Sequence, residues 1–513
     1  MAADTESPEP EARSVSPQPD GYLGLEGRVG QGPSDALVES GYSIEVDDAE
    51  FLHRGLGLAD LAHLLELSDA GVVPDNDAGR LGTQLLALLE TTASDFPYDP
   101  VYGDAYNSRE RELERRIGAV TGWLHTGRTR REAGRIAFRV ALRRAMLDLH
   151  GVASDLTGGL VGRARQHVGT VWNDTTYLQP AQPSTFGHYL AGFAEQATRD
   201  LRRIERAFEW VNVSPGGSGG VAGTAIPIDP HRLATSLGFD RPARNARDGM
   251  WAVDGLVDVA VASVQAVTTL DRLCEDLEVF TSPQFGYVEL SGGASRASVM
   301  LPQKKNPYSL SVIRGGAGTL IGRATGLMVT QRTPSARTDN WLYGYGQTYR
   351  SVLLATRLLA LGSEVVRSLT IDEARLAASA GEHFSVAADL AERIVLDHEV
   401  DYRSAYRLVG RAVADAVRTG RTALTSGDLV RAAKVIGVKA PDGLEDALGS
   451  VADPGTVALG RDTSGGSAPG RVLAQCKAVA GDLMSARRWA KNQEEGIHDA
   501  ETALVVEARR RWS

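Results

Sequence analysis

The sequence predicts an all-α fold of three helical domains around a central bundle of long helices. Apolar residues recur at helical spacing over the long stretches 188–211, 255–280, 308–331 and 350–367. Alternating strand patterns are scarce and no βαβ rhythm occurs, which excludes a doubly wound fold. With 513 residues and 42% hydrophobic content, the chain can bury more than one ordinary core. Because such long helices must bury broad apolar faces, we expect an oligomer to complete the bundle.

In order along the chain, a tail precedes the three helical regions. Residues 1–38 are rich in Pro, Ser, Glu and Gly, and we expect them to be disordered. Residues 39–115 predict an N-terminal helical domain, and residues 116–367 predict the central bundle. The shorter and more charged patterns of residues 368–513 predict a C-terminal helical domain. Within it, the Gly-, Pro- and Asp-rich stretch 441–470 predicts a long loop.

Composition narrows the class of protein. The net charge is -10 with basic and acidic residues interspersed, so we expect no nucleic-acid partner. Cys274 and Cys476 are far apart, and neither they nor the ten histidines show a metal-ligand spacing. No apolar run reaches the roughly 18 residues of a membrane span, and no leader peptide is recognisable. We therefore expect a cytoplasmic protein with no membrane partner, no metal and no cofactor.

The stretch SGGASRASVMLPQKKNPYSLSVIRG, residues 291–315, concentrates the candidate chemistry. Its first half has no side chains that could pack a core, so it predicts a mobile loop. Its second half places Ser298, Lys304 and Asn306 around two prolines, just before a helical pattern begins. Such a loop is a plausible anion clamp. On composition alone, however, clusters of this kind are more often plain surface loops.

The order of residues along the chain favours an anion clamp over a plain surface loop. Four segments resemble those of the fumarase/aspartase superfamily, and most closely its argininosuccinate lyase branch. They occur in the family's order, and the resemblance covers about residues 40–440. It implies the superfamily fold, a homotetramer whose central helices form a shared bundle, and active sites that each draw on three subunits. The segments are WLHTGRTRRE (Trp123–Glu132), TTYLQPAQPSTFGH (from Thr175), VNVSPGGSGGVAGTAIPID (Val211–Asp229) and the loop at 281–315.

The resemblance also implies a reaction, β-elimination from a C2-substituted succinate to give fumarate. Ser298 would be the base, while Lys304 and Asn306 would bind the carboxylate on which negative charge accumulates. Thr129 and Thr176 would donate hydroxyl hydrogen bonds to carboxylates, and His125 and Gln179 would shape the pocket. The expected substrate-binding residues are Thr129, Arg130, Arg131, Thr176, Tyr177, Gln179 and Arg337.

Two departures from the branch concern the leaving group. Tyr177 stands where the branch has a histidine, and Ser311 stands where the glutamate paired with that histidine would fall. In the branch this pair handles the leaving group's proton, and a positioned general acid is worth about 10² to 10⁴ in rate. Tyr177, with an ordinary pKa of about 10, is a poorer acid at neutral pH. We therefore expect a leaving group that departs readily as an anion.

Two added arginines point in the same direction. Arg131 replaces an asparagine of the branch, and Arg337 aligns with a tyrosine of its later substrate segment. Two unit charges about 4 Å apart interact by about 4 kcal/mol at an effective dielectric near 20, so an added arginine disfavours a guanidinium product. The alternative is that either arginine is a surface or ion-paired residue.

The leading hypothesis is a lyase that converts nitrosuccinate to fumarate and nitrite. Nitrite is weakly basic, planar and anionic, and its two oxygens match the fork of an arginine. Two alternatives stay open. One is argininosuccinate lyase or another carbon–nitrogen lyase, including one that acts on a hydrazino- or purine-linked succinate. The other is a catalytically inactive relative with a structural role, which would have no use for Ser298, Lys304 and Asn306 together.

Overall fold

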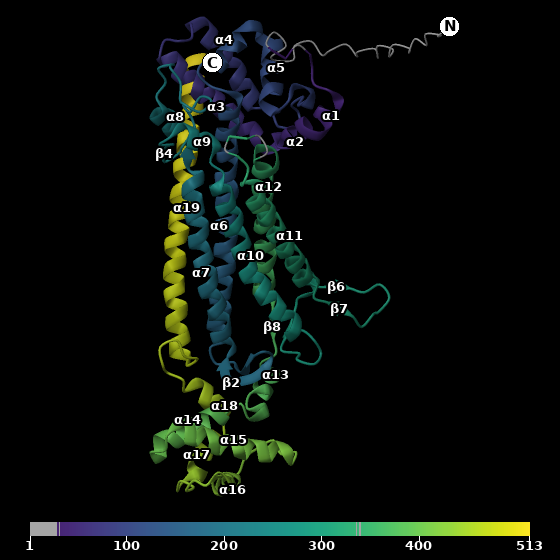
Figure 1. The fold of residues 1–513 in the computed structure, drawn as a ribbon, viewed down its shortest axis with the longest axis vertical. Coiled ribbons are helices and arrows are strands. Elements are labelled where there is room, and N and C mark those ends of the chain that lie inside the picture. Colours follow the sequence, from purple (N-terminus) through teal and green to yellow (C-terminus); the bar gives the residue numbers. More distant parts are fainter. Residues whose placement is uncertain (1–27, 30, 335, 338–339) are drawn as a thin grey trace, which may run out of the picture.

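The computed structural model describes residues 28–29, 31–334, 336–337 and 340–513. Figure 1 shows an elongated molecule with a helical domain at each end and a bundle of long helices between them. The predicted all-α fold is confirmed, because the strands of the described residues are short and form only two-stranded sheets. The predicted disordered tail, residues 1–38, lies largely outside the described residues, and its end at Asp35–Leu37 forms the short helix α1.

The N-terminal domain packs α3 against α4, with leucines such as Leu61 and Leu85 fully buried between the elements. Asp104 caps α5 by accepting the backbone N–H of Asn107 at 2.9 Å. The elements of this domain are η1 (Val38–Tyr42), α2 (Ser43–Val46), α3 (Ala49–Asp69), α4 (Asp75–Leu89), η2 (Pro100–Tyr102), α5 (Ala105–Ile117) and η3 (Gly118–His125).

The central bundle is organised around α6, which packs against α3, α7, α12 and α19. With 37 residues, α6 is about 55 Å long at 1.5 Å per residue. Its apolar side chains are buried on several sides at once, because neighbouring helices surround it. The long helices are α6 (Arg130–Gln166), α7 (Phe186–Val211), α10 (Asp254–Phe280), α11 (Tyr308–Thr330), α12 (Gly346–Ser368) and α19 (Pro469–Trp512).

Helix α19 differs from the predicted C-terminal domain at 368–513. It runs back along the bundle and ends beside the N-terminal domain, as Figure 1 shows. Its last turn fits there because Gly82 has no side chain: a Cβ at that position would lie 2.2 Å from the Trp512 ring. The hydroxyl of Thr83 also donates to the Trp512 carbonyl at 2.7 Å. The charged C-terminal segment is therefore part of the central bundle.

The C-terminal domain lies at the opposite end of the molecule and has its own hydrophobic core. The stretch 441–470, predicted as a long loop, contains two short helices. Asp453 caps the second of them by accepting the N–H groups of Gly455 and Thr456, with Pro454 at the first helical position. The helices here are α13 (Glu373–Ser379), η6 (Glu382–Phe384), α14 (Ala387–His398), α15 (Tyr402–Arg418), α16 (Ser426–Ile436), α17 (Leu444–Ser450) and α18 (Pro454–Leu459).

Short strands and helices connect these bodies. Two of the strand pairs are antiparallel hairpins, β1–β2 and β6–β7, and both carry predicted site residues. The strands are β1 (Val171–Thr176), β2 (Gln179–Thr185), β3 (Val213–Ser214), β4 (Arg241–Pro242), β5 (Val288–Glu289), β6 (Arg296–Ala297), β7 (Lys305–Asn306) and β8 (Thr370–Ile371). The connecting helices are α8 (Pro230–Ser236), α9 (Ala246–Trp251), η4 (Gly292–Ala294) and η5 (Trp341–Tyr345).

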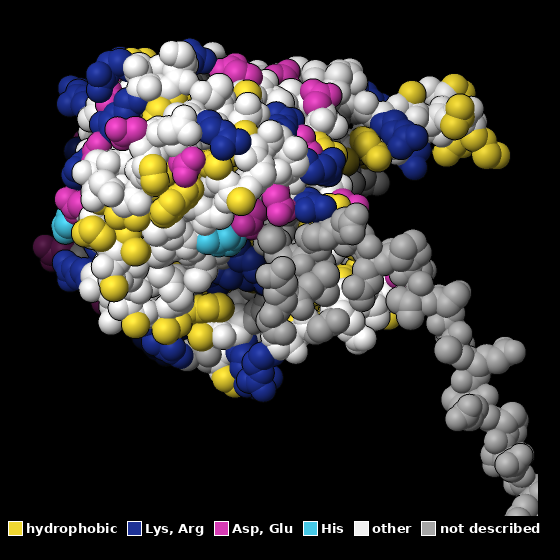
Figure 2. Space-filling model, turned by 90° about the horizontal axis from the view of Figure 1, so that it is seen from above, with side chains coloured by type: hydrophobic (Ala, Val, Ile, Leu, Met, Phe, Trp, Pro, Cys, Tyr) yellow, Lys and Arg dark blue, Asp and Glu magenta, His cyan; other side chains and the backbone are white. Residues whose placement is uncertain are grey.

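Figure 2 looks down on the end that carries the N-terminal domain and shows basic and acidic side chains interspersed there. An arm with hydrophobic side chains at its end projects away from the body in the same view. None of the described helices combines the length and apolar character that crossing a membrane requires. Within the described residues, no group of three or more His, Cys, Asp and Glu side chains is placed to hold a metal ion.

Candidate active site

The start of α6 brings two of the predicted segments together. Thr129 caps the helix: its hydroxyl accepts the N–H of Glu132 at 3.4 Å and donates to the Gly219 carbonyl at 3.2 Å. The buried carboxylate of Glu132 accepts the N–H groups of Gly217 at 2.7 Å and Gly219 at 2.5 Å. These bonds fix residues 215–223, called here the glycine loop, against the helix start.

Buried charges support this end of the helix. Burial raises the pKa of Glu132 to about 7, opposed by its two backbone hydrogen bonds and by Arg128. Arg128 is itself buried and donates to Asp60 at 2.5 Å and to the carbonyl of Ala59 at 3.0 Å. Arg128 and Glu132 therefore hold the helix start in place rather than face an open pocket.

His125 lies at the edge of the same region and is partly exposed. Its Nε2 is 2.7 Å from a carboxylate oxygen of Glu110, which is buried. That hydrogen bond raises the pKa of His125 above its ordinary value, against the opposing effect of burial. The His125 ring also meets the ring of Tyr106 edge-on. His125 is therefore a half-buried side chain at the edge of this region, and the neighbouring Glu110 carboxylate sets the direction of its pKa shift.

The two arginines that follow Thr129 are both ion-paired within the chain. Arg130 donates to Asp104 at 3.1 Å. Arg131 makes a two-pronged ion pair with Glu45, at 2.6 and 3.0 Å, and its guanidinium lies 5.3 Å from the Trp341 ring centre. Arg131 is therefore ion-paired within the chain, which is one of the alternatives left open by the sequence.

Arg337 has different surroundings. It lies in the connection between α11 and η5, and its side chain is exposed. No ion pair of Arg337 is present among the residues that the structure describes. Nearby, the amide of Asn340 donates to the hydroxyl of Thr333 at 3.0 Å and ties the two ends of this connection together. Of the two added arginines, Arg337 has the side chain that is open to solvent.

The hairpin β1–β2 carries the second predicted segment, at the far end of α6. Thr176 and Gln179 face each other across a two-residue turn formed by Tyr177 and Leu178. Both turn residues have positive φ, 56° and 58°, a strained conformation for side chains of this size. The Tyr177 side chain is 98% exposed, so within one chain it acts on nothing. A strained, exposed aromatic at a hairpin tip is placed to contact another molecule.

The fourth predicted segment includes the projecting arm, residues 296–306, around the hairpin β6–β7 (Figures 1 and 2). At its end, the Ser298 hydroxyl accepts the N–H of Leu301 at 3.0 Å, and the apolar side chains of Val299 and Met300 are exposed. Lys304 is exposed as well. Asn306 closes the base of the arm by donating to the Arg296 carbonyl at 2.9 Å.

The three groups of predicted residues do not meet within one chain. The length of α6, about 55 Å, separates Thr129 from the hairpin that carries Thr176. The arm with Ser298 and Lys304 projects from the side of the bundle, away from both (Figure 1). A small substrate could not contact all three groups in a single copy of the protein.

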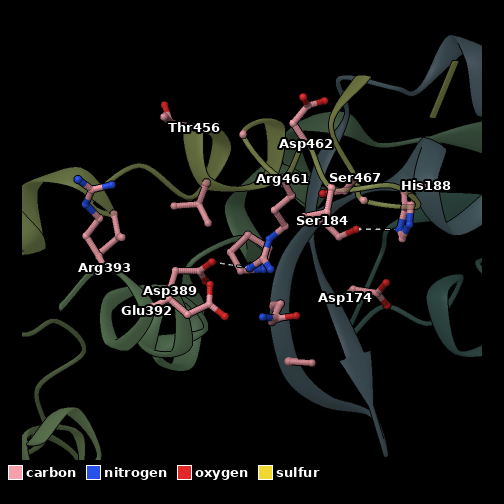
Figure 3. Close-up of a pocket in the computed structure, with 18 of the residues that line it drawn as sticks. Asp174, Ser184, His188, Asp389, Glu392, Arg393, Thr456, Arg461, Asp462 and Ser467 are labelled. Atoms are coloured by element: carbon pink, nitrogen blue, oxygen red, sulfur yellow. Dashed lines mark hydrogen bonds and ion pairs between the residues drawn. The ribbon is translucent and has the colours of Figure 1, made fainter. Parts of the chain in front are cut away.

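A cavity of about 880 Å³ lies elsewhere, between the β1–β2 hairpin and the C-terminal domain. In Figure 3, Arg461 donates to Asp389 at 2.6 Å, and His188 lies 3.4 Å from the Ser184 hydroxyl. His188 also lies 2.9 Å from the Gly465 carbonyl. Thr176 lines the cavity, whereas Ser298 and Lys304 do not, so this pocket lacks the predicted base and cation.

Comparison with known proteins identifies the family of the chain. Residues 67–322 match a protein family described as Lyase. The argininosuccinate lyase of Methanoculleus marisnigri is 32% identical over 468 residues, which are 91% of this chain and 94% of that protein. The chain belongs to the fumarase/aspartase superfamily. Within it, the chain is similar to an argininosuccinate lyase, and the prediction of an enzyme of the carbon–nitrogen lyase type is confirmed.

Solved structures of the superfamily have the same fold. An EDDS lyase in complex with formate aligns with a TM-score of 0.81 and 25% identity, over 90% of this chain and 92% of that one. A class II fumarase from Schistosoma mansoni aligns with a TM-score of 0.68 and 13% identity, over 80% of this chain and 91% of that one. The second likeness concerns the fold alone.

The structure adds residues that sequence reasoning missed. Glu132 lies inside the matched segment WLHTGRTRRE, and its place three residues after the cap Thr129 was the available signal. Glu45 and Trp341 gave no such signal, since each meets Arg131 across a long separation in sequence. Only the folded lyase brings them together.

Proposed function

We propose that this lyase eliminates the C2 substituent of a succinate to release fumarate, with each site assembled from several chains. The observation that carries the proposal is the arm. It presents a serine hydroxyl and an exposed lysine together, beyond the body of its own chain. Groups presented outward in this way serve a site that another copy completes.

In this mechanism, Ser298 takes the proton from the substrate carbon next to the carboxylate. The electron pair left on that carbon is delocalised into the carboxylate, and its collapse forms the double bond of fumarate as the bond to the C2 substituent breaks. The N–H of Leu301, which donates to the Ser298 oxygen, favours the deprotonated serine. Lys304 and Asn306 supply positive charge and a donor where negative charge accumulates.

Exposed glycines on one helix support a homotetramer as part of this proposal. On α11, Gly315, Gly318, Gly322 and Gly326 lie on one face of the helix, and a Cβ added at each would meet nothing within 4 Å. Exposed apolar side chains, including Ile321 and Val329, flank this glycine face. Because interior helix glycines cost about 1 kcal/mol each relative to alanine, a run of them indicates close approach by another helix.

For the leaving group we propose nitrite, with Arg337 as its partner. Arg337 is exposed, whereas Glu45 already binds Arg131. Ser311 stands at the position of the missing glutamate and donates to Glu278 at 3.0 Å, but Arg314 also binds Glu278 at 2.8 Å. That carboxylate is therefore neutralised by an arginine. The absence of a free acid-base pair at this position favours a weakly basic leaving group.

Argininosuccinate is the second candidate substrate, because argininosuccinate lyase of Methanoculleus marisnigri is 32% identical to this chain. Other nitrogen-linked succinates belong to the same alternative. An inactive structural relative is the third candidate, and the exposed lysine and serine of the arm argue against it. The cytoplasmic location stays a prediction from the sequence.

Fumarate formation, followed by ultraviolet absorbance, tests the proposal. Purified protein is offered nitrosuccinate, argininosuccinate and aspartate separately, and nitrite is assayed in parallel. We expect fumarate and nitrite in equal amounts from nitrosuccinate and little fumarate from the other two. Preferred turnover of argininosuccinate would mean that the charge argument at Arg337 is wrong. No fumarate from any of the three would contradict the proposed substrates.

A further inference from the structure

Trp341 packs against the first turns of α6 at a position shaped for it. Its side chain is only 5% exposed, and it begins η5, a five-residue π-helix. A Cβ added at Gly134 would lie 3.0 Å from one carbon of the indole and 3.3 Å from another. The ring therefore occupies the space that an ordinary side chain on α6 would take. Since π-helical turns and helix glycines both carry a cost, their meeting here indicates a selected contact.

Two arginines of α6 hold the same indole. The guanidinium groups of Arg131 and Arg135 each lie 5.3 Å from the Trp341 ring centre. Because the two arginines are four residues apart, they lie one above the other on the same face of the helix. A cation over an indole face is attracted to it, and the attraction is stronger where water is excluded. The pair restrains Trp341 along the helix axis.

The contact continues into the glycine loop. Arg135 is only 2% exposed and also lies 4.5 Å from the ring centre of Trp251. The indole N–H of Trp251 donates to the Gly220 carbonyl at 3.2 Å, and the neighbouring Gly219 carbonyl accepts from Thr129. A continuous path of contacts thus joins Trp341 to the cap of α6.

On the other side, Trp341 follows Asn340, whose amide is bonded to Thr333. This bond and the packed indole fix one end of the connection that carries Arg337. Glu45, which binds Arg131, adds a third element to the same assembly. Trp341 therefore joins the end of this connection to the start of α6.

We infer that Trp341 is a positioning residue that holds the start of α6, with its cap Thr129 and the glycine loop, in place. The inference rests on the proposed function, in which Thr129 binds a substrate carboxylate. Trp341 touches neither the substrate nor the reacting atoms. It determines how firmly Thr129 is held, and so acts on substrate binding.

The test compares Trp341→Ala, Trp341→Phe and the control Trp489→Ala. Trp489 packs against His150 and Phe208 in the bundle, so its loss removes a partly buried tryptophan without touching the Trp341 contacts. We expect Trp341→Ala to raise KM for nitrosuccinate about tenfold while kcat changes less than about threefold, since positioned binding is lost. Trp341→Phe should restore most of KM, and Trp489→Ala should lower Tm without moving KM.

Hydrogen exchange at residues 131–138 of α6 provides a readout that needs no activity. Faster exchange there in Trp341→Ala, but not in Trp489→Ala, is the expected result. An unchanged KM with wild-type exchange in Trp341→Ala would overturn the inference, as would an equal rise of KM in Trp489→Ala. If the wild-type protein releases no fumarate, the proposed function fails, whereas the exchange comparison still tests whether Trp341 holds the start of α6.

Discussion

At the scale of single residues, the two added arginines have separate roles. Arg337 is exposed, and Arg131 is bound to Glu45, which is buried. We predict that Arg337→Ala raises KM for nitrosuccinate about tenfold at unchanged Tm, because a charged hydrogen bond to the leaving group is lost. Arg131→Ala should instead lower the free energy of unfolding by about 1–3 kcal/mol, because Glu45 is left buried without its partner. Steady-state kinetics and thermal melts measure both effects.

The control for this pair is Arg332→Ala, since Arg332 is another exposed arginine of the same connection. It should change neither KM nor Tm. A rise of KM in Arg332→Ala equal to that in Arg337→Ala would show that overall charge, rather than Arg337 itself, governs binding. An unchanged KM in Arg337→Ala would remove this residue from the site.

His125 makes stability depend on pH in a defined direction. Its hydrogen bond to Glu110 raises the pKa of the folded state above the ordinary value of 6.5. The folded state therefore binds the proton more tightly than the unfolded state, and this stabilisation is fully present below 6.5 and lost as pH rises through the folded pKa. We predict that the Tm difference between wild type and His125→Asn is largest at acidic pH and narrows toward alkaline pH. Thermal melts across that range check it, and a difference that widens with pH contradicts the assignment.

At the scale of elements, the exposed glycine face of α11 is the most specific feature. We predict that Gly322→Leu breaks the proposed tetramer and removes activity while the chain still folds, because a Cβ there meets nothing within 4 Å of its own chain. Light scattering and fumarate release measure this. The control is Gly79→Leu on α4, where a Cβ also meets nothing within 4 Å. A Gly322→Leu protein with unchanged mass and activity would place the interface elsewhere.

The helices and hairpins also show which structural features could be predicted from sequence patterns. The long amphipathic helices were predictable because their apolar period is a local property, as in α7 and α10. The return of α19 along the bundle was not, since it depends on Gly82 accepting Trp512 across almost the whole chain. The hairpin at Tyr177 was also missed, because its turn residues are not the glycine and asparagine that such turns favour.

The candidate site likewise contains residues that the sequence could predict and contacts that it could not. Ser298, Lys304 and Thr129 were predicted from local motifs, and in the structure the first two share the arm whereas Thr129 lies at the start of α6. The ion pair of Arg131 with Glu45 and its contact with Trp341 could not be predicted, since nothing near Arg131 in sequence specifies either partner. A sequence motif predicts the role of a residue, whereas tertiary contacts determine whether its side chain is ion-paired.

At the scale of the whole molecule, the account depends on the separation of Ser298 from Thr129. One chain cannot bring the arm to the start of α6, so the proposed site must combine chains. Two variants isolate the two halves of such a site. Ser298→Ala removes the base, and Thr129→Asp repels a dicarboxylate while keeping a good helix cap. Each variant alone should lose fumarate release by at least about 10²-fold.

The most direct measurement is fumarate release by a tetramer co-expressed from equal amounts of Ser298→Ala and Thr129→Asp chains, with the succinate that the wild type turns over. If the two residues of each site come from different chains, random mixing leaves about a quarter of the sites with both intact, and activity should recover to about a quarter of the wild-type value. If activity stays at the level of the separate variants, Ser298 and Thr129 do not meet across chains, and the shared site is contradicted.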